Sequence, residues 1–483
     1  NCAFGSHALQ LNTTAANNSA FGHRALDANT TGASNTAVGS AALGANTTGA
    51  NNTAVGANCS EDITTGAKNT AVGKSALATL TTGNENVAMG ESAMLNASTA
   101  YDSVAIGYEA GKALTTAHSN TIIGQQAGLT ITTGNDNVII GDAAALAAAT
   151  DAAGCVVIGQ AAALNCPEDE LLAIGYNALN ASVSGAVFNT AVGYKALKSN
   201  TTGTRNVALG WEAGENLTTA NRCILIGQNV AQGVMTGDDN NIIGREAGYN
   251  ITSGTRNNSL GNYTLDAVTI GNDNTAVGHN AGTAITTGSS NVLIGNSVGS
   301  AVSGGANNTF MGIDAGTSIT TGSNNLLLGH DAGTSNSPGG VIQDGSSNQL
   351  VLGDNSITHS YVKVDWTVTS DRRDKTDITP FNHGLSWINK LNPVTYRWDN
   401  RSFYEDGKPD GSKKQLQLNV GLIAQDEIEV EKEHGFGDTS ENMIVSHITE
   451  DGNYGMQYSK LVPILINAVK ELSTKNDELA AEI

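Results

Sequence analysis

The strongest constraint on the fold is a glycine that returns every 17 residues. The spacing of 17 starts at Gly5 and holds as far as Gly141. It then becomes 18, 16 and 18 before it returns to 17 and continues to Gly329, which makes 20 units. A fixed short period over such a length predicts a solenoid, in which each unit buries its apolar side only by stacking on its neighbours.

One unit shows how a coil can be built. Residues 189–193 read Asn-Thr-Ala-Val-Gly, and the alternation of small and apolar residues favours a β-strand. The glycine permits a backbone angle that a Cβ atom would forbid. Seventeen residues suffice for two short strands and two turns, so we predict one coil of a parallel β-roll per unit. Val, Ile and Leu would stack into a narrow core, and Ala and Gly on the flanks would let three copies pack closely.

Composition narrows the partners and cofactors. The formal net charge is −21 and no basic patch is visible, so nucleic acid is not expected as a partner. The five cysteines lack a zinc-ligand spacing and are expected to be small buried side chains in a protein assembled in a reducing cytoplasm. We therefore predict no metal and no cofactor. These cysteines are Cys2, Cys59, Cys155, Cys166 and Cys223.

Two features of the repeat allow more than one interpretation. Rows of threonine, such as Thr47-Thr48 and Thr64-Thr65, would suit either an ice-binding face or turn residues that hydrogen-bond locally, and we favour the second. The irregular stretch between Gly141 and Gly193 contains 143–149 and 166–170. It would be either a receptor-binding bulge or a plain register insertion, and we favour the insertion.

The repeat gives way to a different kind of sequence. We assign residues 1–340 to the β-roll and residues 341–369 to a β-rich neck, and residues 370–483 to a mixed α+β domain. The neck alternates apolar residues in strand fashion, at Leu350, Leu352, Tyr361, Val362, Val364, Trp366 and Val368. The last domain should contain a short helix at 385–391, strands at 394–398 and 419–425, an acidic helix at 426–434 and an amphipathic C-terminal helix at about 458–483. The fold class is thus mainly β, followed by an α+β domain that ends in a long helix.

The repeated Asn-x-Ala-Val/Ile-Gly-x-x-Ala pattern resembles the head domain of trimeric autotransporter adhesins over about residues 1–335. That resemblance implies a left-handed β-roll in a homotrimer. The period here is longer than in those heads, mainly through the Thr-Thr-Gly turn.

The tail carries four motifs in order that resemble the endosialidase-type intramolecular chaperone, which lies at the C-terminus of phage tailspikes and tail fibres. Leu422 and Asp426 depart mildly from that family's pattern, which often has Phe and Glu there. The four motifs are Ser370-Asp371-x-Arg373-x-Lys375, Leu391-Asn392-Pro393-Val394, Gly421-Leu422-Ile423-Ala424-Gln425-Asp426 and Tyr458-x-x-Leu461.

The resemblance implies a domain that trimerises, aligns the preceding β-structure and then cuts the bond before its own serine. Here that bond is Thr369–Ser370, with Ser370 as nucleophile and Lys375 as general base. Lysine accepts a proton at neutral pH only if burial or nearby positive charge lowers its pKa. The motif residues Asp371, Arg373 and Gln425 would support the site, and Arg373 with Arg372 would supply positive charge. A spacing of five does not place two side chains on one face of a straight helix, so a turn must bring them together, either in the single chain or only once the trimer has formed.

The expected protein is therefore a trimeric phage tail fibre or tailspike that attaches to a host-cell receptor, a glycan or a surface protein. We expect it in the virion tail after assembly in the host cytoplasm. It would join other tail proteins through a region upstream of Asn1, which opens in mid-repeat. Its only catalysis would be one self-cleavage per chain. The alternatives are a trimeric cell-surface adhesin that keeps its tail, and a polysaccharide depolymerase acting between subunits.

Overall fold

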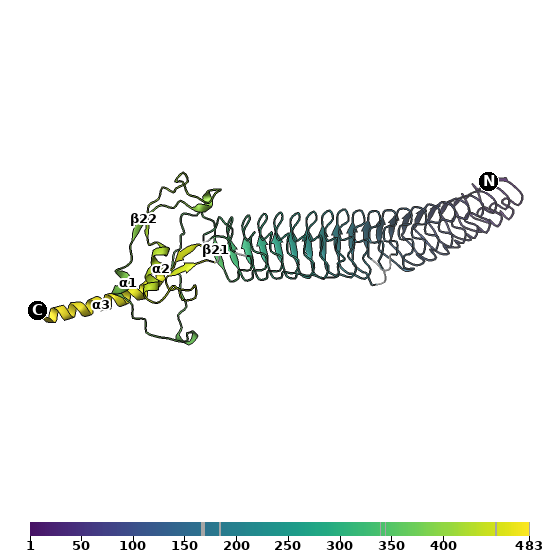
Figure 1. The fold of residues 1–483 in the computed structure, drawn as a ribbon. Coiled ribbons are helices and arrows are strands. Elements are labelled where there is room, and N and C mark those ends of the chain that lie inside the picture. The colour runs from purple at the N-terminus through teal and green to yellow at the C-terminus, as the bar shows by residue number, and fades with distance from the viewer. Residues whose placement is uncertain (166–169, 183–184, 339, 343, 450–451, 483) are drawn as a thin grey trace. The chain divides into compact units, whose positions relative to one another are not determined.

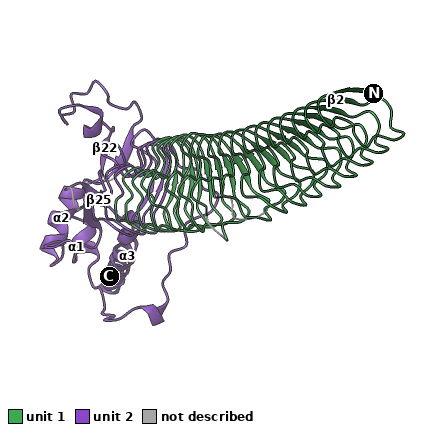
Figure 2. Ribbon diagram, turned by 90° about the vertical axis from the view of Figure 1, so that its right-hand side faces the viewer, with its two compact units in different colours: residues 1–294, 303–306 green, residues 295–302, 307–483 purple. Residues whose placement is uncertain are grey.

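The structure is a computed structural model that describes residues 1–165, 170–182, 185–338, 340–342, 344–449 and 452–482. The chain divides into two compact units (Figure 2). Unit 1 comprises Asn1–Ile294 with Ser303–Ala306, and unit 2 comprises Gly295–Val302 with Asn307–Ile483. No helix within the described ranges is both long and apolar enough to span a membrane.

Unit 1 is a parallel β-solenoid whose coils stack like the turns of a spring (Figure 1). Each coil contributes one strand of three residues, and equivalent residues pair across coils, as Ala37 does with Ala54. This confirms the predicted solenoid of 17-residue turns. Its described strands are β1 Cys2–Phe4, β2 Ser19–Phe21, β3 Thr36–Val38, β4 Thr53–Val55, β5 Thr70–Val72, β6 Val87–Met89, β7 Val104–Ile106, β8 Thr121–Ile123, β9 Val138–Ile140, β10 Val156–Ile158, β11 Leu172–Ile174, β12 Thr190–Val192, β13 Val207–Leu209, β14 Ile224–Ile226, β15 Asn241–Ile243, β16 Asn258–Leu260, β17 Thr275–Val277 and β18 Val292–Ile294.

The glycine that ends each strand is required by the next coil. Gly39 has a φ of 139°, a value that favours glycine, and a Cβ atom there would lie 2.2 Å from the carbonyl oxygen of Gly56. Gly56 stands in the same relation to Gly73, at 2.4 Å. The 17-residue period is therefore the period of a close backbone contact.

A row of buried asparagines holds most coils closed and joins them to the next, while Ser103, Cys155, Leu171 and Cys223 occupy the equivalent position in four coils. Asn52, which is 1% exposed, donates from Nδ2 to the carbonyl of Gly66 at the end of its own coil, at 2.8 Å. Its Oδ1 accepts the backbone N–H of Asn69 one coil later, at 2.9 Å. One side chain thus satisfies buried backbone groups of two coils, where an unpaired group would be costly.

The second side of each coil differs from the prediction of a second strand. It consists of turns in which alternate residues take left-handed angles, as at Ala41 (φ 53°) and Leu43 (φ 50°). This alternation directs the N–H of Leu43 to the carbonyl of Cys59 in the next coil, at 3.1 Å. A left-handed angle costs an L-residue roughly 1–2 kcal/mol, and the bonds between coils and the burial of the Leu43 side chain offset that cost.

The positions of the apolar residues also correct the sequence analysis. The middle residue of a strand points inward and is often alanine, such as Ala37 and Ala54, whereas Val38 and Val55 face outward and are 38% and 36% exposed. The flank is therefore lined by larger apolar residues than expected. Because the interior is narrow, alanine at the strand centre goes with leucine at the turn in many coils, whereas a large strand residue such as Phe310 goes with a glycine at the turn, Gly316.

The threonine rows and the cysteines show two further differences. Thr47 Oγ1 donates to the carbonyl of Thr64 at 3.0 Å, so the hydroxyl bonds join coils and are not local to one turn. Cys59, Cys155 and Cys223 are buried as expected, but Cys2 is exposed because it lies in the first strand. Cys166 lies outside the described residues.

The irregular stretch keeps the strand register. β10 pairs with β9 and β11 through equivalent residues although the glycine spacings there are 18 and 16. Within 143–149, Ala144, Ala145 and Ala148 are buried, as core residues are elsewhere. These features favour the insertion over the receptor-binding bulge, whose residues 166–169 lie outside the described residues.

Unit 2 contains three more strands of the solenoid type and the mixed tail. β19 Thr309–Met311, β20 Leu326–Leu328 and β21 Leu350–Leu352 pair in parallel, with β21 reached after a longer coil. The other described elements are η1 Arg372–Asp374, α1 Leu385–Ile388, β22 Val394–Tyr396, η2 Arg401–Phe403, β23 Asn419–Gly421, α2 Ala424–Glu433, β24 Ser446–Ile448, β25 Tyr454–Met456, η3 Tyr458–Lys460 and α3 Leu461–Glu482. β22 with β23 and β24 with β25 form antiparallel pairs. This confirms the small α/β region that ends in a long helix, although the β24–β25 pair was not predicted.

The tail has a small core of its own around Trp387, which is fully buried. Helix α3 closes this core and also positions α1: Glu471 Oε2 accepts the N–H of Leu385 at 3.0 Å. The core residues are Trp387, Val430, Val445, Leu461 and Ile464.

The neck is less regular than its sequence pattern predicts. Within the described part of 341–369, β21 is the only strand, and residues 353–369 follow without a regular element. Tyr361, Trp366 and Val368 are 90%, 72% and 81% exposed, because no neighbouring strand covers them in the single chain. The assignment of 341–369 as a separate neck stays a prediction.

We predict that Gly39→Ala will open the solenoid locally. The new methyl group must move the Gly56 carbonyl and occupy a left-handed angle, which together should cost about 2–5 kcal/mol. Amide hydrogen exchange of the peptides around β3 and β4 will measure the loss. Gly304→Ala is the control, since its Cβ would meet only Thr287 Oγ1 at 3.6 Å. Equal protection in both variants would contradict the proposed role of the glycine contact.

Candidate self-cleavage site

The structure brings Ser370 and Lys375 together through a single turn of 3-10 helix. Asp371 caps this turn, η1, by accepting the N–H of Arg373 at 2.9 Å, and the N–H of Lys375 bonds the carbonyl of Arg372 at 3.3 Å. The turn reverses the chain so that Lys375 Nζ donates to Ser370 Oγ at 2.5 Å. The contact therefore forms within one chain and does not need a second copy.

The charges around this pair are partly neutralised. The guanidinium of Arg373 donates two hydrogen bonds to Asp371 Oδ2, from Nη2 at 2.6 Å and from Nε at 3.1 Å. Hydrogen bonding to Arg373 lowers the pKa of the Asp371 carboxyl, which stays ionised at neutral pH. Because its charge is matched in this way, Arg373 contributes less to the environment of Lys375 than the sequence analysis expected.

The pair and the chain before it are open to solvent. Ser370, Lys375 and residues 361–369 are all exposed in the single chain. A lysine becomes a base at neutral pH when it is buried or placed near excess positive charge. The single chain thus supplies the nucleophile–base geometry but does not exclude water from it.

The remaining motif residues have structural contacts rather than contacts with the pair. The hydroxyl of Tyr458 accepts the N–H of Leu422 at 2.9 Å, which joins the third motif to the fourth. A Cβ atom on Gly421 would lie 2.6 Å from that same hydroxyl. Gln425 is exposed in the first turn of α2, and among the described residues it makes no hydrogen bond to Ser370 or Lys375.

Two buried glutamates of α2 were missed by sequence analysis. Glu431, which is fully buried, accepts three backbone N–H groups, from Ile444, Val445 and Ser446, and the hydroxyl of Ser446, at 2.6–2.9 Å. Glu427 accepts the indole N–H of Trp387 at 2.8 Å, and its second oxygen is buried with no hydrogen-bond partner. The available signal was their spacing of four residues, on a face where an amphipathic helix usually places apolar residues.

Burial raises the pKa of Glu427 to about 7, and the neighbouring Glu431 adds to this rise. Below about pH 7 the folded tail therefore keeps the Glu427 carboxyl mainly protonated and neutral beside the Trp387 indole.

The comparison with known families agrees with the motif-based resemblance. Residues 370–436 match the model of the peptidase S74 family, described as chaperone of endosialidase. The match begins at Ser370 itself, covers 67 of the 483 residues and ends before the Tyr458 motif and α3. No curated protein and no solved structure significantly matches the chain. A β-solenoid followed by this segment fits a tail-fibre or adhesin-like protein with an intramolecular chaperone.

We predict that the tail loses stability as the pH rises from 4.5 to about 7. A carboxyl whose pKa is raised on folding stabilises the folded state below its unfolded pKa, and this contribution disappears as the pH passes the folded pKa. The loss should be on the order of 3 kcal/mol. Amide hydrogen exchange in α2, corrected for intrinsic rates, will measure it.

Glu427→Gln should remove most of this pH dependence and protect α2 at pH 8, because the amide is neutral and can still accept from Trp387. Glu431→Gln is the comparison. An amide has only one oxygen to accept the four hydrogen bonds that the carboxylate accepts, so this variant should weaken α2 at every pH. A wild-type α2 with the same protection at pH 5 and pH 8 would refute the assignment.

Proposed function

We propose that this protein is a phage tail fibre or tailspike whose C-terminal domain trimerises, aligns the solenoid and then cuts the chain at Thr369–Ser370. The observation that carries the proposal is the 2.5 Å contact between Lys375 Nζ and Ser370 Oγ, at the first residue of the matched family segment. The solenoid would attach the virion to a glycan or protein of the host surface. The chain would be assembled in the host cytoplasm and would join other tail proteins.

The proposed chemistry uses only groups of the chain and water. Ser370 Oγ adds to the carbonyl carbon of Thr369 while its proton passes to neutral Lys375. The bond between Thr369 carbon and Ser370 nitrogen then breaks, and the departing amine takes a proton from the lysine. Water hydrolyses the resulting ester, which leaves a carboxylate on Thr369 and the free hydroxyl on Ser370.

The need for an alignment device follows from the repeat. Most coils present the same strand, glycine and turn, so a shift of one coil between copies would keep similar contacts. Parallel β-structure also folds through distant pairings and is slow to form. A trimer nucleated at one end would set the register, and cleavage would make assembly irreversible.

Helix α3 supports the trimer proposal. It exposes apolar residues at a spacing of three and four, which is typical of a coiled-coil seam. Leu465, Val469, Leu472 and Leu479 are 46%, 66%, 56% and 59% exposed, and Asn476 falls between them at the remaining seam position. A buried asparagine at one seam position is a known way to fix register.

The cleavage proposal predicts a fragment that covers residues 370–483. Denaturing electrophoresis and mass spectrometry of freshly expressed protein should find it in the wild type. Ser370→Ala and Lys375→Ala should abolish it, whereas Lys390→Ala, another exposed lysine of the tail, should not. An uncut wild-type chain would overturn self-cleavage and favour the adhesin that keeps its tail. Sugar release from host envelopes would favour the depolymerase.

The trimer proposal predicts that the uncut Ser370→Ala protein has a molar mass three times that of the chain in light scattering. Val469→Glu combined with Leu472→Glu should lower this mass to one chain, because the charges cannot be buried in the seam. In a chain that keeps Ser370, the same two substitutions should slow cleavage at least tenfold if Lys375 becomes a base only in the trimer. Lys470→Glu on the same helix is the control and should stay trimeric. A monomeric Ser370→Ala protein would contradict the proposal.

A further inference from the structure

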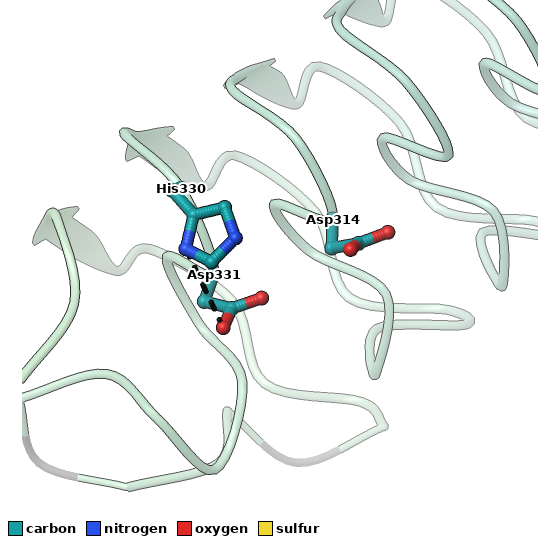
Figure 3. A group of neighbouring side chains, drawn as sticks. All are labelled: Asp314, His330 and Asp331. Carbon is teal, nitrogen blue, oxygen red and sulfur yellow. Dashed lines mark ion pairs between the residues drawn. The ribbon is translucent and has the colours of Figure 1, made fainter.

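Three consecutive coils of unit 2 bring a histidine and several carboxylates together. Asp314 follows β19, His330 and Asp331 follow β20, and Asp354 follows β21. One ligand atom from each of Asp314, His330 and Asp331 lies within 4.8 Å of the others (Figure 3). The imidazole Nδ1 of His330 is 3.5 Å from Asp331 Oδ2 and 3.3 Å from Asp354 Oδ2.

The carboxylates in this cluster have no lysine or arginine partner among the described residues. In unit 1, several outward carboxylates are paired with a cation one coil away, as Glu85 is with Lys68 at 2.6 Å and Asp273 with Arg256 at 2.6 Å. The sequence contains no Lys or Arg between Arg256 and Lys363. Among the described residues, Asp331 and Asp354 form ion pairs only with His330.

Asp314 adds a further negative charge without a partner within the described ranges. Its carboxylate has no hydrogen bond or ion pair among the described residues, although it lies one coil from Asp331. Like charges at neighbouring positions of a parallel stack are unfavourable, and a cation between them would reverse the sign of the interaction.

We propose that Asp314, His330 and Asp331 bind one divalent transition-metal ion of the Zn²⁺ class, with Asp354 assisting. Metal–ligand bonds of about 2.1 Å in tetrahedral geometry place neighbouring ligand atoms about 3.4 Å apart, close to the separation of Nδ1 and Asp331 Oδ2. An imidazole with carboxylates suits Zn²⁺ or Co²⁺, whereas Ca²⁺ prefers six to eight oxygen ligands.

A hydrogen bond from Asn336 to Asp331 also suits a metal ligand. Asn336 Nδ2 donates to Asp331 Oδ2 at 2.9 Å, and such a bond orients a ligating carboxylate. The site would tie together the coils of β19 and β20, next to the place where the glycine spacing rises from 17 to 24, between Gly329 and Gly353. The ion would thus hold the last coils of the solenoid together where the repeat itself becomes irregular.

The experiment uses the full chain, freed of metal with a chelator, in a Cys2→Ser background because that exposed thiol would compete for zinc. Zn²⁺ is titrated by calorimetry, and Co²⁺ is followed by its visible absorption. We expect one equivalent per chain. His330→Asn, Asp331→Asn and Asp314→Asn should each weaken binding at least tenfold, and Asp354→Asn should weaken it less.

His279→Asn is the matched control, because His279 occupies the same coil position as His330 but is followed by Asn280 instead of an aspartate. Its variant should bind as the wild type does. Zn²⁺ should also slow amide exchange in 309–331 of the wild type and not of the His330→Asn protein, a readout that remains available if one aspartate variant folds poorly. Absence of saturable binding by the wild type, equal affinity in His330→Asn, or tighter binding of Ca²⁺ than of Zn²⁺ would overturn the proposal.

Discussion

The structure depends on a backbone contact that repeats once per coil. At each strand end the chain passes so close to the next coil that only glycine fits, and the glycine also adopts an angle that other residues avoid. The buried asparagine row then satisfies the backbone groups that this close stacking removes from water. The two features together fix the period and the register, so the side chains on the outside are free to vary.

Because the glycine and asparagine rows hold the coils together, the outward side chains are available for function. Outward positions hold valine and methionine in some coils, ion pairs in others and the His330 cluster in the last ones. None of these side chains is needed to close a coil. A repeat protein of this kind can therefore place binding groups from different coils side by side, at a separation set by the strand spacing of about 4.8 Å.

The tail is held together by contacts between residues distant in sequence and not by a repeated contact. Its small core is organised by polar contacts that cross long stretches of sequence: Trp387 with Glu427, Glu431 with the segment that begins β24, and Glu471 with the start of α1. Such contacts specify one arrangement because each buried group would be left unpaired in any other. These contacts use ionisable carboxyl groups, whereas the buried row of the solenoid uses asparagines, which carry no charge.

The sequence by itself determined the solenoid and its period, which follow from local rules: a glycine every 17 residues and a threonine-glycine turn. The proposed cleavage pair came from the resemblance of the tail motifs to a known family. The tertiary structure decided what depends on contacts between distant residues. It replaced the second strand by left-handed turns, put Ala37 inside and Val38 outside, and paired Arg373 with Asp371. It also brought Asp314, His330 and Asp331 together, because residues separated by a whole coil become neighbours only when the coils stack.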